Sequence, residues 1–414
     1  MAQHRADIII IGGGIAGLWT LNRLSRMGYN ALLLENNALG GGQSIASQGI
    51  IHSGLKYALA GKISALAQSI SAMPDLWRRA LEGKDLSAED VDLSQAQIRA
   101  PSQIMLIPAG LTGGIIKIAA KKALGNSVRD IPASQWPEAL QNSGFMGSAI
   151  FMGEPVIDVP SVIKALAAPY QDRIRKADID FARDIAESEN DVRVTIGAET
   201  ITAAKIIFTA AQGNHPAATM RLQDKGLKTQ RRPLLMGMLR SAPFEIYAHL
   251  IGAAEKPVAT ITTHKDAQGR LVWYIGGQVA EREKDVPAQE TIRAIEFAFQ
   301  KYFPALSLEA AQWAVLPIDR HEGSSATEGW MPDTPTLHSI GRSIYGWPTK
   351  LTFAPLLADK IIKKLDEDGI APSQSVTDWS WLLAAPYAKA PWDRNEDRNE
   401  DRDGDEDEEN MQWR

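Results

Sequence analysis

The 414-residue chain contains no cysteine. This absence excludes disulfide bonds, thiolate metal sites, a cysteine nucleophile and a cysteine-tethered cofactor, and it fits a reducing compartment. The sequence also has no apolar run long enough for a transmembrane helix, and MAQHRAD leads directly into an apolar strand pattern without signal-peptide anatomy. We therefore predict a cytoplasmic protein, with peripheral contact at the inner face of a membrane left open.

A dense basic patch is absent as well, so nucleic acid is not an expected partner. The net charge of −6 comes from one segment. Asp393–Glu409 holds eleven acidic residues and three arginines, a net charge of −8, which leaves +2 for the rest of the chain. Such an acidic, low-complexity tail is expected to be solvated and disordered. It either keeps the protein soluble or docks onto a basic protein partner.

The predicted elements are interleaved along the chain. Runs typical of parallel strands and their helices occur at the start, in the middle and at the end, with antiparallel-type alternation between them. This order predicts an α/β fold: a split Rossmann-like dinucleotide-binding domain, an inserted α+β substrate domain with a mixed or antiparallel sheet, and a C-terminal extension. The expected bounds are 1–75, 154–225 and 316–370 for the first domain, 76–153 and 226–315 for the second, and 371–414 for the extension.

The first 35 residues have the order of a βαβ unit. The run ADIIIIGG at 6–13 is typical of a strand buried on both faces, and residues 15–28 have helical spacing with Gly28 at the end. NALLLE at 30–35 is a second short strand that ends in an acid. This length and order match the unit that binds dinucleotides.

Three glycines at the turn into the helix, Gly12, Gly14 and Gly17, satisfy the GxGxxG pattern. They permit a tight turn, a close approach of backbone to a pyrophosphate and close packing of helix on strand, while the helix N-terminus favours the phosphate charge. Glu35 lies near the position where an acid takes the ribose hydroxyls. A second fingerprint is missing around 108–116, and a single dinucleotide at the N-terminus of a split domain favours FAD over NAD.

Further elements follow from periodicity. We expect a helix over 61–81 that is interrupted near Pro74, a strand within 102–110, an apolar strand within 201–214, and helices over 288–303 and 351–369.

The stretch from Glu35 to Tyr57 carries a family resemblance. It resembles the FAD-dependent D-amino-acid oxidase superfamily, and most of all its L-2-hydroxyglutarate and glycerol-3-phosphate dehydrogenase branches, through Gln43, Ser44, Ser47, Gly49, His52, Gly54 and Tyr57. EPVID at 154–158, DTP at 333–335 and WPTKLT at 347–352 are similar to later family elements in the same order. The resemblance covers residues 5–370. It implies an FAD-dependent dehydrogenase or oxidase.

The resemblance also implies which residues contact FAD. The sequence departs from the family pattern where Thr209-Ala210-Ala211 is followed by Gly213 two places late, and where Trp347-Pro348 replaces glycines. The implied contacts are Gly12, Gly14, Ile15, Ala16, Gly17, Glu35, Asn36, Gln43, Ser44, Ser47, Gln48, Gly49, Ala210, Ala211, Gly213, Thr349, Lys350, Leu351 and Thr352. No metal is expected.

A base is needed beside the flavin, because a substrate C–H leaves as hydride only when the attached OH or NH gives up its proton. Histidine is the usual residue for this task near neutral pH. His52 follows the polar flavin loop and is our candidate. Its other two readings are a histidine that packs against the ring and a covalent histidyl–flavin link. Of the remaining histidines, only His321 is a second candidate for this base. His249 has no neighbouring motif that would give it a role.

Cations are expected at two places. Lys350 stands at a helix start, where its charge and the backbone N–H groups would favour negative charge on the flavin, although it could also be a solvated lysine. Arg320 lies where the family often holds a carboxylate-binding arginine, with a salt bridge as the other reading. Lys56 and Tyr57 match the family's substrate-facing pair.

The leading hypothesis is a flavoenzyme that oxidises a small, anionic substrate at a C–OH bond, with oxygen or a carrier as electron acceptor. The substrate classes considered are hydroxy acids, amino acids and glycerol phosphates. One alternative is oxidation at a C–N bond. A second is a flavin-containing subunit whose acidic tail and tryptophans, Trp379, Trp381, Trp392 and Trp413, recruit a partner.

Overall fold

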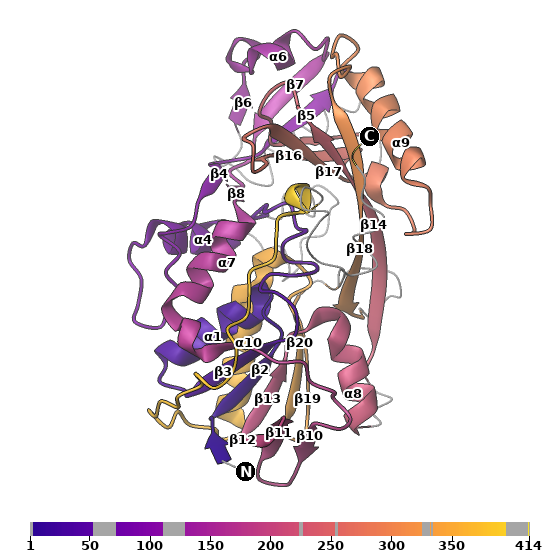
Figure 1. Cartoon of the computed structure of the whole chain (residues 1–414). Helices are drawn as coiled ribbons and strands as arrows, with labels where there is room; N and C mark the ends of the chain where they lie inside the picture. Colours follow the sequence, from indigo (N-terminus) through magenta and orange to yellow (C-terminus); the bar gives the residue numbers. More distant parts are fainter. Residues whose placement is uncertain are drawn as a thin grey trace.

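The computed structural model describes residues 3–52, 72–110, 129–222, 227–252, 256–324, 332, 334–394 and 413. Within them a six-stranded sheet forms the base of the molecule (Figure 1). Its strands pair in parallel except at one edge, where β19 is antiparallel to β20. In spatial order they are β19 (Thr336–Ile340), β20 (Ser343–Trp347), β13 (Lys205–Phe208), β2 (Ile8–Ile11), β3 (Ala31–Glu35) and β9 (Ile174–Lys176).

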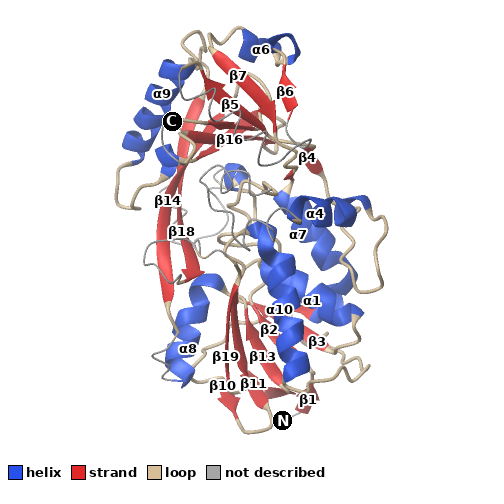
Figure 2. Ribbon diagram, turned by 180° about the vertical axis from the view of Figure 1, so that it is seen from behind, coloured by secondary structure: helices blue, strands red, loops and turns tan. Residues whose placement is uncertain are grey.

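Helices cover one face of this sheet and a small second sheet covers the other. Successive side chains of a strand point to opposite faces, so one run of isoleucines packs into both cores. Ile8 and Ile10 face one core with the helices, while Ile9 and Ile11 face another with a small second sheet. The helices are α1 (Ile15–Arg26), α4 (Met73–Glu82), α7 (Val159–Ala167) and α10 (Ala354–Glu367), seen in front of the sheet in Figure 2. The small sheet contains β1 (Gln3–Arg5), β12 (Glu199–Ala203), β11 (Val192–Ile196) and β10 (Ile185–Glu187).

An eight-stranded, mostly antiparallel sheet lies at the other end of the elongated molecule (Figure 1). Its order is β18 (Gln312–Gly323), β14 (Thr229–Arg240), β17 (Leu271–Gly276), β16 (Ala259–Lys265), β15 (Ala248–Leu250), β5 (Ile104–Pro108), β7 (Gly147–Phe151) and β6 (Arg129–Ile131). The helices α9 (Ala288–Tyr302) and α6 (Glu138–Gln141) belong to this end, and α8 (Asn214–Leu222) lies near the six-stranded sheet. The short strands β4 (Ile98–Ala100) and β8 (Val156–Ile157) pair separately.

The mixed α/β architecture confirms the predicted fold class, while details differ from the sequence expectations. Pro74 lies in the first turn of α4, where its missing N–H costs nothing; the earlier part of the expected helix, residues 61–71, lies outside the described part. The expected boundary at 316 falls inside β18, which pairs with β14 along its whole length. The chain therefore returns to the six-stranded sheet only at Thr336. The division into domains otherwise stays a prediction.

Residues 371–394 form a strap that runs from the six-stranded sheet to the eight-stranded one (yellow in Figure 1). It is held at its start by Thr377, which donates to the carbonyl of Arg5, and further on by a bridge between Tyr387 and Leu39. At its end the indole of Trp392 stacks on His264, with 3.9 Å between ring centroids. The strap therefore ties the two sheets together.

The tryptophans proposed to recruit a partner are largely used inside the molecule. Trp379 and Trp392 are buried, Trp381 stacks on His4, and the guanidinium of Arg240 lies 3.9 Å from the ring centre of Trp413. The acidic residues 395–412 lie outside the described part, so a docking role for the tail stays a prediction. No helix within the described ranges is long and apolar enough to cross a membrane.

The imidazole of His264, on which the strap stacks, makes the stability of the folded protein depend on pH. Burial, with a smaller contribution from the charge of Arg99, lowers the pKa of His264 from 6.5 to about 3. Between these values the unfolded chain binds a proton that the folded chain does not, so stability falls as pH drops below 6.5. The loss is about 2 kcal/mol between pH 6.5 and 5, at about 1.4 kcal/mol per pH unit.

Thermal unfolding of the wild type and of His264→Gln, followed from pH 7 to pH 5, tests this linkage. The variant lacks the titrating group, so its melting temperature should fall less on acidification. Equal pH slopes for the two proteins would contradict the assignment.

Candidate functional site

A cavity of about 2180 Å³ lies between the two large sheets, beyond the carboxyl ends of β2 and β13. This edge of a parallel sheet is where α/β folds bind ligands. Of the residues expected from the sequence, Gly17 is not in the cavity wall, and Lys56 and Tyr57 lie outside the described residues. The wall brings together Gly12, Gly14, Ile15, Ala16, Glu35, Asn36, Gln43, Ser44, Ser47, Gln48, Gly49, His52, Ala210, Ala211, Gly213, Arg320, Thr349, Lys350, Leu351 and Thr352.

The turn between β2 and α1 requires glycine at two places. Gly12 has a φ of +104°, and a Cβ there would approach the backbone of Ala210 to 2.8 Å. A Cβ on Gly17 would collide with the carbonyl oxygen of Gly12, so a side chain at 17 would push α1 off the strand. These constraints give the cavity a wall of bare backbone at the start of α1, which suits an anionic diphosphate.

Glu35 closes the same wall from the end of β3. Its Oε2 accepts from the backbone N–H of Gly13 at 2.6 Å, and its Oε1 accepts from that of Asn37 at 2.9 Å. The two bonds hold the carboxylate at the cavity, where sugar hydroxyls would find an acceptor. Ser44 is also fixed, because its Oγ accepts from the N–H of Ile15 at 2.9 Å.

The polar loop before His52 is anchored on both sides of the cavity. Gln48 donates from Nε2 to the carbonyls of Thr260 and Tyr274, both at 2.9 Å, and so reaches the eight-stranded sheet. Ile51 donates its N–H to the carbonyl of Pro155 at 2.9 Å. The loop is therefore positioned by elements that are distant in sequence, and it delivers His52 to the cavity wall.

The opposite wall comes from two strained turns. Ala211 has a φ of +49° and Thr349 a φ of +67°, both in the left-handed region. The indole of Trp347 donates to the carbonyl of Ala211 at 3.1 Å and links these turns. The sequence placed a helix start at 349–352, and this was wrong. The helix α10 begins only at Ala354, and a 3₁₀ turn over Leu351–Phe353 precedes it.

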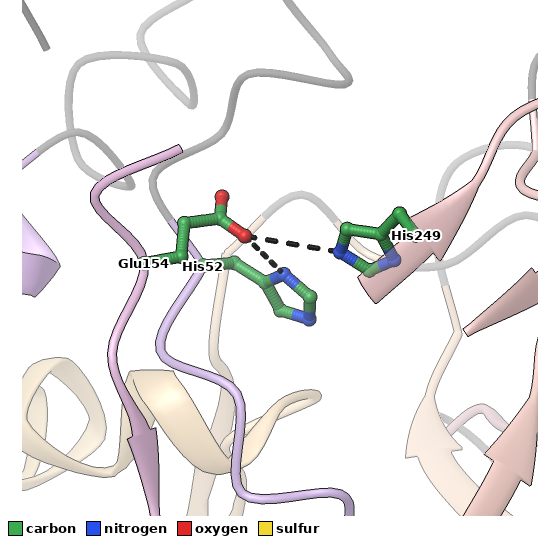
Figure 3. Close-up of side chains that lie close together, drawn as sticks. All are labelled: His52, Glu154 and His249. Carbon is green, nitrogen blue, oxygen red and sulfur yellow. Dashed lines mark ion pairs between the residues drawn. The ribbon is translucent and has the colours of Figure 1, made fainter. Parts of the chain in front are cut away.

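His52, Glu154 and His249 lie together beside the cavity (Figure 3). Nδ1 of His52 is 3.5 Å from Oε2 of Glu154, and Nε2 of His249 is 3.8 Å from the same oxygen. The two imidazole rings are 18° from parallel, with 6.0 Å between their centroids. Sequence reasoning gave no role to His249 and noticed Glu154 only as part of a motif. Neither residue has a local sequence signal that could have revealed the cluster.

Glu154 is only 2% exposed. Burial alone would raise the pKa of its carboxyl, but the contacts with His249 and then His52 outweigh it, and the pKa lies well below the ordinary range. The side chain is therefore a buried carboxylate at neutral pH.

Both expected cations that the structure describes, Arg320 and Lys350, line the cavity. Three further arginines form ion pairs. Arg231 pairs with Glu283 and Asp319, Arg232, which also lines the cavity, with the buried Glu322, and Arg240 with the buried Asp266. The reserve candidate His321 also lines the cavity, and burial lowers its pKa, which keeps it neutral.

Comparison with known proteins shows the family of this chain. The family model described as FAD dependent oxidoreductase matches residues 7–348. The probable FAD-dependent oxidoreductase PA4991 of Pseudomonas aeruginosa is 38% identical over 394 residues, which cover 94% of this chain and 97% of the relative. In the crystal structure of that protein, 98% of the chain aligns with 95% of ours at a TM-score of 0.78 and 32% identity.

Two more distant structures share the fold. Glycine oxidase from Geobacillus kaustophilus aligns over 90% of this chain and 100% of its own at a TM-score of 0.60 and 16% identity. L-α-glycerophosphate oxidase from Mycoplasma pneumoniae, solved with FAD bound, aligns over 88% of this chain and 95% of its own at 0.61 and 15%. At these low sequence identities the two structures show a shared fold, and they say nothing about the substrate of this chain.

The resemblance to the superfamily and the expectation of FAD are thereby confirmed, whereas the hydroxyglutarate or glycerol-phosphate branch is not. The glycine turn, the acid at the end of β3 and the cavity beyond the sheet all fit this cofactor. This chain belongs to the family of FAD-dependent oxidoreductases and is an enzyme that uses FAD.

Proposed function

We propose that the enzyme oxidises a small, anionic substrate at a C–OH bond. The observation that carries this proposal is His52 on the cavity wall, with one ring nitrogen 3.5 Å from a buried carboxylate. An amine has already given up its proton once its ammonium form becomes neutral, so its hydride can leave without a strong base, whereas a hydroxyl must lose its proton as the hydride leaves. An imidazole supported by a buried negative charge is a stronger base than an isolated one. The site is therefore better suited to an alcohol.

The roles of the residues follow from their positions. Bound FAD supplies a hydride acceptor at N5 of its isoalloxazine ring. His52 takes the hydroxyl proton, which leaves a C=O product. In the two other readings of His52 it packs against the flavin or is bonded to it, and substitution distinguishes them.

Arg320 is proposed to bind the anionic group of the substrate. It lies on β18, a twelve-residue strand paired along its length with β14, and this rigid support suits a bidentate clamp. Lys350 enters the cavity from the turn before α10 and adds positive charge on the opposite wall. Substrates of the hydroxy-acid or glycerol-phosphate class carry the negative charge that both cations would attract.

The cofactor contacts are proposed for the cavity residues named above. The bare backbone at Gly12, Gly14 and the start of α1 would hold the pyrophosphate, and Glu35 would accept from the ribose hydroxyls. The loop from Gln43 to Gly49 and the turn from Thr349 to Thr352 would hold the flavin end.

A substrate screen tests the function directly. Anaerobic holoenzyme is mixed with hydroxy acids, with amino acids of the same carbon skeletons and with glycerol phosphate, while flavin absorbance is followed. We expect a hydroxy acid or glycerol phosphate to bleach the flavin, and the matched amino acid to leave it oxidised. Bleaching by amino acids alone, with release of ammonia, would move the assignment to a C–N bond.

Removal of the base should separate binding from chemistry. His52→Asn is expected to retain FAD and substrate affinity but to reduce flavin about 10²- to 10⁴-fold more slowly, the usual contribution of a general base. Stopped-flow absorbance measures the rate constant. An unchanged rate of flavin reduction would show that the imidazole ring only packs beside the flavin. Release of the flavin when the wild type is denatured would exclude a covalent histidyl–flavin link.

Glu35 supplies a test that does not depend on turnover. Glu35→Gln should weaken FAD binding about ten- to hundredfold, since a bond from a hydroxyl to a charged acceptor contributes about 1.5–3 kcal/mol. Titration of apoprotein with FAD, followed by flavin fluorescence, gives the dissociation constant. Glu296→Gln on the exposed face of α9 is the matched control. Equal affinities in both variants would remove Glu35 from the cofactor site.

A further inference from the structure

Three distant segments of the chain converge on the oxygen Oε2 of Glu154. His52 follows the polar loop, Glu154 stands between β7 and β8, and His249 is the central residue of β15 (Figure 3). The backbone holds each in place. The carbonyl of Glu154 accepts from the N–H of Gln103 at 2.7 Å, and the N–H of Ile51 donates to the carbonyl of Pro155 at 2.9 Å.

His249 is oriented by a second contact of its ring. Its Nδ1 is 2.8 Å from Oγ1 of Thr260, on the neighbouring strand β16. This hydrogen bond fixes the ring plane and directs Nε2 at Glu154. A histidine whose far nitrogen is held in this way presents one defined nitrogen to its partner.

The cluster of His52, Glu154 and His249 is too buried to hold an uncompensated charge. Glu154 is 2% exposed and His249 4%, so the carboxylate needs a positive partner close by. With both imidazoles neutral, the cluster would leave an isolated buried negative charge. One proton on the histidine pair cancels that charge. The distances of 3.5 and 3.8 Å place both imidazoles within electrostatic reach of the same oxygen atom.

We propose that His52, Glu154 and His249 act as one proton-accepting unit, in which Glu154 and His249 are positioning residues for His52. This inference rests on the proposed function, in which His52 takes the substrate proton. The shared carboxylate keeps one proton on the histidine pair at rest, on His249, because its Nε2 faces Glu154 while its Nδ1 can donate to Oγ1 of Thr260. His52 is then neutral and turned to the cavity when substrate arrives, and its imidazolium is stabilised once it forms.

The proposed step transfers one proton and one hydride from the substrate. The substrate O–H bond breaks and its proton moves to Nε2 of His52, the nitrogen that points away from Glu154 in Figure 3. The carbon–hydrogen bond breaks with both its electrons, which pass as hydride to FAD, and the carbon–oxygen bond becomes double. The substrate loses two electrons, which bound FAD would accept. Reoxidation by oxygen or a carrier, the electron acceptor of the enzyme, completes the cycle.

Other charges near the cluster are already engaged among the described residues. Arg78 of α4 donates to the carbonyl of Gly153, and Arg99 of β4 pairs with Asp158 at 2.7 Å. Tyr247, beside β15, has a pKa raised to about 12 by burial and by the charge of Glu245, so it does not titrate near neutrality. The charges that act on Glu154 are those of His249 and His52. The pH response of the site should therefore follow these three residues.

The test compares Glu154→Gln with the wild-type holoenzyme. The glutamine keeps the shape and removes the charge that favours a protonated imidazole. The rate constant of anaerobic flavin reduction should fall ten- to hundredfold at its high-pH plateau. Its midpoint on the pH axis should move down by at least one unit, because the unsupported base holds its proton less tightly. Substrate affinity should change less than the rate.

Asp158→Asn is the matched control. This carboxylate is buried in the same segment, pairs with Arg99 and caps α7 through the N–H of Ser161, and no ion pair joins it to the histidines among the described residues. Its pH midpoint should stay at the wild-type value. Glu154→Asp, which retains the charge, should restore the midpoint in part. An unshifted midpoint in Glu154→Gln would overturn the inference.

A second readout needs no substrate. The chain has only seven histidines, so ¹⁵N-histidine NMR of the holoenzyme can be assigned with His52→Asn and His249→Asn. Titration curves of both rings should shift to lower pH in Glu154→Gln, and the His249 substitution should alter the His52 curve. If these curves stay unchanged, the unit does not exist, even where substrates reduce the flavin. If they shift while no substrate reduces it, only the proposed function fails.

Metal analysis completes the test. The three donor atoms lie within 4.8 Å of one another, and two histidines with a carboxylate are also a donor set for zinc or iron. The proton-accepting unit predicts no stoichiometric metal in the purified holoenzyme and no loss of rate after chelation. A divalent metal retained at one per chain and lost in Glu154→Gln would overturn the inference.

Discussion

The buried negative charge of Glu154 constrains the reacting end of the cavity. It can persist in an apolar setting only if positive charge is close by, and the two histidines that supply it come from opposite parts of the molecule. His52 belongs to the loop that leaves the six-stranded sheet, and His249 to the eight-stranded one. The same contact that satisfies Glu154 therefore holds the two halves in register and, in the proposed mechanism, sets the protonation of His52, which would face the substrate.

The cofactor end depends on a different constraint, which is how closely backbone can approach backbone. Gly17 lets α1 pack on the end of β2, and Gly12 turns the chain so that bare peptide faces the cavity. The long pair β14 and β18 carries Arg320 to the far wall, and the strap of residues 371–394 ties both sheets together. The proposed dinucleotide site and the proposed proton-accepting site thus meet in one cavity because rigid elements deliver both.

Local pattern was enough to predict much of this arrangement. The isoleucine run, the GxGxxG turn, Glu35 and the helix over 288–303 depend on periodicity and on glycine geometry, which are properties of short segments. The cluster at Glu154 could not be found in this way. Its members are about a hundred residues apart, and they meet only through non-local pairings, such as β15 between β16 and β5. Likewise, only the pairing of β18 with β14 along its whole length showed that residues 316–323 belong to the eight-stranded sheet.

The central claim is that one active site breaks a C–H bond next to a hydroxyl while histidine takes the hydroxyl proton. The most direct measurement is the deuterium isotope effect on anaerobic flavin reduction by a reactive hydroxy substrate, in water and in deuterium oxide. The account predicts a several-fold slower reaction when the carbon carries deuterium, and a further solvent effect that is present in the wild type and lost in His52→Asn. A rate that is unaffected by deuterium on that carbon would contradict the account.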